Sequence, residues 1–314
     1  MIKKVIFSAL SLFIGLTSFS QSFKVVPLGV LGGSHEDNLS AYMVAPIGQN
    51  QYVCLDVGTL YAGIQKAIDF HTFQGDALQI LRDSIKGYLI SHGHLDHLSG
   101  LILNSPDDTA KPIYAMPYVL DVFKKHYFSW DTWANFADEG EKPALSKYHY
   151  VAFTEGKEIP LANTKMWVKA FPLSHGKPYQ STAFLFHSNQ GYLLYLGDTG
   201  ADRIEQSQKL DSLWKSVAPL IKTHQLKAMM IEVSFPNAQP EKQLFGHLTP
   251  NLLMEEMKQL SKYVGADAMK NLNVVITHMK PSGNHLQEMK DELINSNILD
   301  LNLIFPKQGE ALVF

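Results

Sequence analysis

Three histidines and one aspartate fall within six consecutive residues, His92 to His97, which read HGHLDH. The preceding GYLIS predicts a buried strand and the following LSGLILNS a helix, so the six residues are expected on a turn at a sheet edge, where ligand sites commonly lie. His92 and His94 are two residues apart and can project the same way, whereas Asp96 and His97 must diverge. One zinc ion takes about four ligands, so this divergence favours two metal ions.

An alternative interpretation is a polar loop whose histidines only cap a helix. So many residues of metal-ligand type directly after a buried strand disfavour it.

Two metal ions need further ligands, and three strand-like runs are each followed by one. His175 follows KMWVKAFPL, Asp198 follows GYLLYL and His278 follows NVVI. A lone histidine is more often structural than a ligand, but the repeated placement at strand ends predicts that all three residues join the site.

Short apolar runs separated by polar or glycine-rich turns predict strands along most of the chain. Several runs are apolar almost throughout, which indicates strands that are covered on both faces. Helical periodicity occurs between them, at Ile64–Ile68, Ala77–Ile85, Arg203–Leu220 and Leu252–Val264. Strands interleaved with helices favour a layered α/β domain with its helices outside the sheets. Strand patterns fade over residues 116–143, where we predict a helical insertion or lid; a plain pair of surface helices is the alternative.

The first 20 residues have the parts of a secretory signal peptide. Two lysines precede an apolar run, Val5–Leu16, and small residues follow it. The run is shorter than the roughly 20 residues of a membrane-spanning helix. We therefore predict cleavage near Ser20–Gln21 and an exported chain, periplasmic or secreted, without stable membrane association; a buried N-terminal strand or helix is the alternative. With no linker or repeat visible, residues 21–314 are expected to form a single catalytic domain.

Cleavage would remove two lysines and change the formal net charge from −3 to −5. Proteins that bind nucleic acids usually carry a basic patch, so this acidity argues against a nucleic-acid polymer as partner. A small anionic substrate is still allowed, because a metal ion supplies local positive charge. Cys54 is the only cysteine and lies in an apolar run, which excludes an intrachain disulfide and predicts a buried strand residue rather than a catalytic thiol.

HxHxDH followed by strand-end His, Asp and His resembles the metallo-β-lactamase superfamily of binuclear metallohydrolases. LDVGT, Leu55–Thr59, is similar to the early strand and turn of that superfamily, with Asp56 as a support behind the ligands. The resemblance narrows further along the chain. HGHLDHLSGLILNSP, His92–Pro106, satisfies every position of the signature of class II cyclic-nucleotide phosphodiesterases, and LGGSHEDNLSAYMV, Leu31–Val44, resembles the N-terminal stretch of that family.

This resemblance implies an αββα sandwich with two central mixed sheets flanked by helices. It also implies two divalent metal ions, with zinc as the default because it suits imidazole and carboxylate ligands, while iron or manganese is compatible. The implied ligands are His92, His94 and His175 for one ion and Asp96, His97 and His278 for the other, with Asp198 as a bridge.

The implied reaction is hydrolysis of 3′,5′-cyclic nucleotides, cAMP or cGMP or both, to nucleoside 5′-monophosphates by a hydroxide that bridges the ions. Asp96 could orient this nucleophile as well as bind metal. FGHLTP, Phe245–Pro250, resembles a motif of the tRNA 3′-processing nucleases, so we expect His247 to donate to the leaving oxygen or to hold the phosphate, and Glu232 to orient His247. An ordinary helix-start histidine beside a buried glutamate is the alternative.

Other functions of the same fold remain alternatives, namely another phosphodiesterase, an arylsulfatase-like esterase or a β-lactamase, because one metal site serves many chemistries. A metal- or nucleotide-binding protein without catalysis is a further alternative, which the complete ligand set disfavours. The expected partner is a small cyclic nucleotide, whose base could stack on an aromatic side chain of the insertion at residues 116–143. A homodimer is the prior expectation for the assembly.

Overall fold

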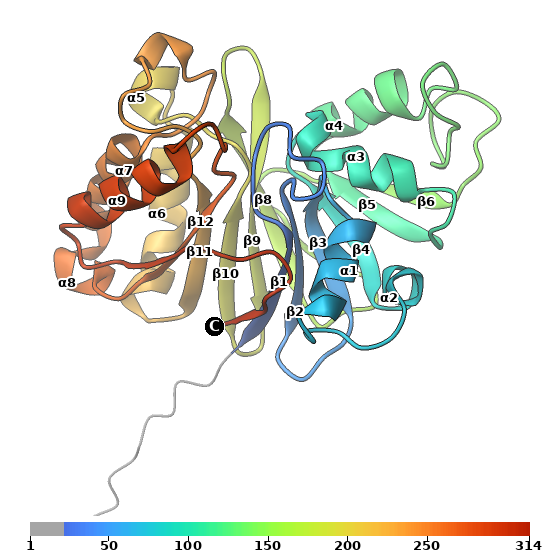
Figure 1. Cartoon of the computed structure of the whole chain (residues 1–314), viewed down its shortest axis with the longest axis horizontal. Coiled ribbons are helices and arrows are strands. Elements are labelled where there is room, and N and C mark those ends of the chain that lie inside the picture. The colour runs from blue at the N-terminus through green and yellow to red at the C-terminus, as the bar shows by residue number, and fades with distance from the viewer. Residues whose placement is uncertain (1–21) are drawn as a thin grey trace, which may run out of the picture.

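Two mixed β-sheets form the centre of the structure, a computed structural model that describes residues 22–314 (Figure 1). The first sheet has the strand order β14–β1–β2–β3–β4–β5–β6, antiparallel as far as β3 and parallel from β3 to β6. Its strands are β1 (Phe23–Gly29), β2 (Ala41–Pro46), β3 (Tyr52–Val57), β4 (Ile85–Ile90), β5 (Lys111–Ala115), β6 (Tyr148–Ala152) and β14 (Leu312–Val313).

The second sheet has the order β13–β12–β11–β10–β9–β8–β7. Its strands are β7 (Glu158–Pro160), β8 (Trp167–Ser174), β9 (Gln180–Ser188), β10 (Gly191–Leu196), β11 (Leu226–Glu232), β12 (Asn273–Thr277) and β13 (Asn302–Ile304). Strands β10 to β13 are parallel, and β9 is antiparallel to both β8 and β10. Strands β8 and β10 therefore point the same way as β11 and β12, so four carboxyl ends meet at one edge.

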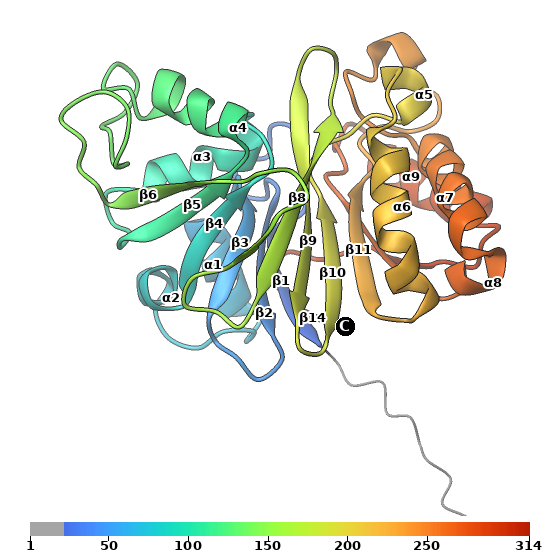
Figure 2. The ribbon, with the colours of Figure 1, turned by 180° about the vertical axis from the view of Figure 1, so that it is seen from behind.

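Helices cover the outer face of each sheet (Figures 1 and 2). Those beside the first sheet are α1 (Tyr61–Asp69), α2 (Ala77–Asp83), α3 (Leu95–Asn104) and α4 (Pro117–Val122), which continues into the π-helix η1 (Phe123–Tyr127). Those beside the second are α5 (Asp202–Glu205), α6 (Lys209–Lys222), the 3₁₀-helix η2 (Glu241–Gln243), α7 (Pro250–Val264), α8 (Ala266–Met269) and α9 (His285–Ser296). This is the predicted αββα sandwich.

Apolar faces of both sheets form the central core, as the period-two pattern of the strands requires. Tyr42 of β2 and Tyr195 of β10 are both buried, and their ring centroids lie 6.0 Å apart across the two sheets. A second apolar cluster lies under α6 and α7, where Trp214 is fully buried. The two sheets are thus packed firmly against each other, and the loops at their shared edge are anchored to rigid strands.

The predicted insertion at residues 116–143 is helical only as far as Tyr127. From residue 128 to residue 147 the chain is irregular, because its polar side chains satisfy backbone groups locally. Asn135 donates to the carbonyl oxygens of Glu139 and Glu141 and accepts from the N–H of Ala137. Phe128 is fully buried and stacks on Tyr148, so the aromatic side chains here build a local core.

The predicted signal peptide, residues 1–20, and its cleavage point lie outside the described residues, so export stays a prediction. Within residues 22–314, none of the helices combines the length and the apolar character needed to cross a membrane.

A buried ion pair at the start of β5 gives a prediction for stability. Asp108 accepts from Lys111, from Tyr88 Oη at 2.5 Å and from Tyr148 Oη at 2.9 Å, and both charged side chains are buried. Asp108→Ala leaves the ammonium without its counter-charge, which should lower the free energy of unfolding by about 3–5 kcal/mol. Urea unfolding followed by circular dichroism, with a chelator present, measures this loss.

The matched control is Glu310→Ala, which removes the exposed partner of Lys307 at 3.4 Å. Its effect on the free energy of unfolding should stay below about 1 kcal/mol. Equal effects of the two substitutions would contradict the importance of the buried pair.

Candidate metal centre

The predicted ligands come from loops at the edge where the carboxyl ends of parallel strands meet. His175 follows β8, Asp198 follows β10 and His278 follows β12. The HGHLDH segment connects β4 to α3, with His94 at the N-cap of the helix and Asp96 in its first turn. The strand-to-helix turn expected from the sequence is therefore present, and the two sheets contribute to one site.

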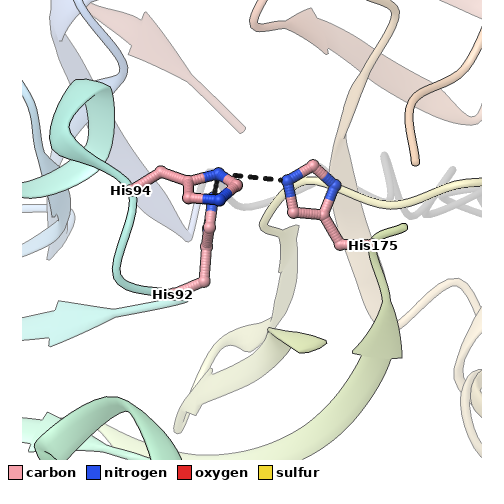
Figure 3. Close-up of side chains that lie close together, drawn as sticks. All are labelled: His92, His94 and His175. Carbon is pink, nitrogen blue, oxygen red and sulfur yellow. Dashed lines mark hydrogen bonds between the residues drawn. The ribbon is translucent and has the colours of Figure 1, made fainter. Parts of the chain in front are cut away.

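His92, His94 and His175 form a first cluster, in which the imidazole nitrogens point toward one another (Figure 3). His94 Nδ1 lies 3.1 Å from His92 Nε2 and 3.2 Å from His175 Nε2. Burial lowers the pKa of His92 well below its usual value and that of His94 to about 4. Neutral imidazoles are the form that binds metal, and their converging lone pairs suit one cation.

Asp96, His97 and His278 form a second cluster. Asp96 Oδ2 lies 3.1 Å from His278 Nε2, and the rings of His97 and His278 stack with centroids 4.8 Å apart. His97 Nε2 is buried and, among the described residues, makes no hydrogen bond. Burial acts to lower the pKa of His97, but the carboxylates of Asp198 and Asp56 hold it well above its usual value. This nitrogen faces the carboxylate of Asp198, where positive charge is stabilised.

Asp198 lies between the two clusters. Its Oδ2 atom is 3.2 Å from His97 Nε2 and 3.3 Å from His278 Nε2, and 3.8 Å from both His92 Nε2 and His175 Nε2. One carboxylate thus faces ligand nitrogens of both clusters. This donor set of imidazoles and carboxylates fits two divalent metal ions. The division of the ligands between the ions stays a prediction.

Asp56 stands behind the ligands, as the sequence predicted. This buried carboxylate accepts from Ser91 N and Ser91 Oγ at 2.7 Å, from Tyr195 Oη at 2.6 Å and from His97 Nδ1 at 2.8 Å. Because Nδ1 of His97 donates to Asp56, its Nε2 is left to face the site. Asp56 itself has a left-handed backbone with φ of 51°, which Asp and Asn tolerate better than most residues.

Two tyrosines hold the peptide group of Gly93, between the first two ligands. Tyr127 of η1 donates its hydroxyl to Gly93 O at 2.8 Å, and the N–H of Gly93 donates to Tyr179 Oη at 3.2 Å. The ring of Tyr179 also stacks on His94, with an interplanar angle of 4° and centroids 4.6 Å apart. A Cβ at Gly93 would lie 2.7 Å from Val122 Cγ1, so the close approach requires glycine. This tyrosine clamp positions His94, which is the exposed member of the predicted ligand set.

Glu232 and His247 form the pair that the sequence predicted. His247 Nδ1 donates to Glu232 Oε1 at 2.7 Å, and it lies 3.7 Å from Asp198 Oδ2. Both side chains are buried, and burial raises the pKa of Glu232 to about 7 and lowers that of His247 to about 4. Glu232 also accepts from Thr199 N at 3.0 Å and from Ser234 Oγ at 2.6 Å, which fixes its carboxylate.

Sequence reasoning missed Lys280 and left the glycines of the LGGSH stretch without a role. Lys280 Nζ lies 2.8 Å from His247 Nε2, a contact that no spacing in the sequence signals. A Cβ at Gly32 would lie 2.3 Å from the ring of His278, and the N–H of Gly33 donates to Asp96 Oδ2 at 3.1 Å. The Leu31–Val44 resemblance covered these glycines without indicating that they touch ligands.

Asp56→Asn tests the support behind His97. The amide keeps the size of the carboxylate and tolerates the left-handed backbone, but it lacks the charge that four donated hydrogen bonds share. Loss of such outer support should reduce metal affinity about 10- to 100-fold. Metal content by emission spectroscopy after dialysis against graded chelator measures the change. Asp211→Asn on α6 is the control, and equal metal retention in both variants would refute the role of Asp56.

Comparison with known proteins places the chain in a family. The family model described as class-II cAMP phosphodiesterases matches residues 23–295. A 3′,5′-cyclic-nucleotide phosphodiesterase of Aliivibrio fischeri is 40% identical over 325 residues, covering 99% of this chain and 98% of the relative. A probable 3′,5′-cyclic-nucleotide phosphodiesterase of Yersinia pestis is 38% identical, covering 100% of this chain and 95% of the relative.

Solved structures agree on the fold. Unliganded yeast PDE1 superposes with a TM-score of 0.81 at 22% identity, over 94% of this chain and all (100%) of that chain. A metallo-β-lactamase-fold protein of Bacillus subtilis gives a TM-score of 0.61 at 15% identity, over 92% of this chain and 99% of the other. The chain therefore belongs to the class-II cAMP phosphodiesterases, which confirms the family that the resemblance of its sequence predicted.

Proposed function

We propose that the chain hydrolyses 3′,5′-cyclic nucleotides, cAMP or cGMP, to nucleoside 5′-monophosphates with the help of two divalent metal ions, zinc by default. The observation that carries this proposal is the convergence of two ligand clusters on Asp198, whose Oδ2 lies within 3.8 Å of a ligand nitrogen in each. The substrate class is supported by the relatives from Aliivibrio fischeri and Yersinia pestis, which are named as cyclic-nucleotide phosphodiesterases. Their similarity to this chain extends over nearly their whole length.

The chemistry that bound divalent ions supply at such a site is activation of water at neutral pH and stabilisation of charge on phosphoryl oxygens. His92, His94 and His175 would hold one ion, and Asp96, His97 and His278 the other. The chain itself supplies orientation. Asp56 fixes the ring of His97, and the N–H of Gly33 donates to Oδ2 of Asp96 beside His278, which would place this carboxylate to direct an attacking water.

His247 is the residue that we assign to the leaving 3′ oxygen. Its Nδ1 is engaged by Glu232, so the ring is held with Nε2 as the atom available to substrate. In this structure Nε2 accepts from Lys280, because an ammonium can only donate. His247 can therefore donate to the leaving oxygen only after Lys280 has moved away from Nε2 and that nitrogen has taken up a proton from water.

The other hydrolase functions of this fold differ from the proposed one in their substrates. The His247–Glu232 pair favours phosphoester cleavage over β-lactam opening, because a departing alkoxide needs a proton or a donor. The formal net charge of −3 disfavours a polynucleotide substrate.

Product analysis tests the proposal. Metal-loaded protein should convert 3′,5′-cAMP or cGMP to the 5′-monophosphate and not to the 3′-monophosphate, because the 3′ oxygen is the leaving group. A chelator should abolish turnover, and added zinc should restore it. The assay uses chromatography of the products, with bis-(p-nitrophenyl) phosphate and a β-lactam as parallel substrates. A folded, metal-loaded sample that cleaves neither cyclic nucleotide would sink the proposal.

His247→Gln should lower kcat about 10²- to 10⁴-fold while metal content stays that of the wild type, because it removes a donor and not a ligand. Glu232→Gln should have a smaller effect, since its amide oxygen still accepts from His247 Nδ1. Steady-state kinetics with cAMP and metal analysis measure both. His187→Gln, at the opposite end of β9, is the control, and full turnover by His247→Gln with metals bound would rule out its role.

A further inference from the structure

Lys280 lies at the rim of the metal centre, and its main chain is fixed from two sides. It follows β12 two positions after His278. Its N–H donates to Ser234 O at 3.3 Å, and the preceding Met279 forms a β-bridge with Leu31. Lys280 therefore sits where a loop of the first sheet meets the strand ends of the second, and its position does not depend on a mobile tail of the chain.

The side chain of Lys280 points to His247 along an aromatic surface. Its Nζ atom lies 2.8 Å from His247 Nε2 and 5.0 Å from the ring centroid of Phe235. The ring of Phe235 in turn meets the ring of His247 edge-on, with centroids 5.7 Å apart. Phe235 thus supports the ammonium from one side. One of the three N–H groups of Lys280 is used by His247, and two remain for another acceptor.

Among residues 22–314, the polar side-chain partner of Lys280 is His247 and not a carboxylate, although the lysine side chain is half-buried. Lys111, the buried lysine at the start of β5, by contrast has Asp108 as its partner. The two carboxylates of the ligand set, Asp96 and Asp198, do not neutralise two divalent ions. A half-buried ammonium at the rim of such a centre is therefore placed to bind an anion that also meets the metal ions.

We propose that Lys280 binds the non-bridging phosphoryl oxygens of the substrate, an inference that rests on the proposed function. A phosphodiester carries the anionic oxygens that the free N–H groups of the ammonium require. When Lys280 donates to a phosphoryl oxygen in place of His247 Nε2, that nitrogen is also freed to face the leaving oxygen. Lys280 thus couples the arrival of the phosphate to the release of His247 Nε2, which can donate once it has taken up a proton from water.

A purely structural role predicts a different outcome. If Lys280 only held the ring of His247, its loss would lower kcat and leave the binding of phosphate esters unchanged. If Lys280 binds phosphate, its loss weakens the binding of substrate and of product. The two roles are therefore separated by affinity measurements that do not depend on turnover.

Isothermal titration of the metal-loaded protein with 5′-AMP and with inorganic phosphate makes this measurement. Lys280→Met should raise the Kd for 5′-AMP about 10- to 100-fold, because a hydrogen bond to a charged group is lost. The Kd of the wild type should rise more steeply with salt than that of the variant. Lys280→Arg should recover part of the affinity, since the charge stays but the geometry differs. Lys290→Met is the matched control, because Lys290 Nζ lies 5.6 Å from the ring of Phe305, away from the ligands.

A wild-type Kd for 5′-AMP in Lys280→Met, or a loss confined to kcat, overturns the inference. Metal content and melting temperature are measured on every sample, and Lys280→Gln replaces the methionine variant if either quantity falls. Turnover of bis-(p-nitrophenyl) phosphate is recorded in parallel. A wild type that binds 5′-AMP and cleaves this ester but no cyclic nucleotide refutes the proposed function, while the binding comparison at Lys280 still stands or falls by itself.

Discussion

A single buried carboxylate, that of Asp56, connects the parts of the molecule that the metal centre requires. It lies at the end region of β3 and accepts hydrogen bonds from the segment after β4, from α3 and, through Tyr195, from β10 of the opposite sheet. A carboxylate removed from water is costly unless every lone pair is used, so this group tolerates few arrangements of its neighbours. A shift of one sheet against the other would break the hydrogen bond from Tyr195 to Asp56, so this contact helps to fix the position of His97. The apolar core supplies most of the stability, whereas Asp56 supplies geometry.

Much of the site could be predicted because its signals are local. The ligands stand directly after strands whose apolar runs are short and clear, and parallel strands bring their carboxyl ends together without further information. The helix predicted over Arg203–Leu220 is instead two helices, because Gln206 adopts a left-handed conformation with φ of 51° that ends α5. Strands β7 and β14 were not predicted, since three and two residues are too short to show a period.

The remaining contacts lie beyond sequence reasoning for a physical reason. Lys280 meets His247 across 33 positions of the chain, and Tyr179 meets Gly93 across 86. No sequence spacing of a lysine or a tyrosine indicates its contact partner, so these two contacts become visible only in the folded structure. The insertion illustrates the same limit, because after Tyr127 the hydrogen bonds of Asn135 stabilise an irregular segment where the fading strand pattern had predicted helix.

The tyrosine clamp on Gly93 connects the insertion with the loop that carries His92 and His94. Tyr127 belongs to the π-helix of the insertion, a rare conformation that costs regular hydrogen bonding and that proteins retain mainly at functional sites. Because its hydroxyl holds the peptide between His92 and His94, the wide turn of η1 sets where the exposed ligand stands. Removal of the insertion would therefore leave the carbonyl of Gly93 without this donor. The insertion and the ligand loop are therefore one structural unit, connected by the hydrogen bond from Tyr127 Oη to Gly93 O.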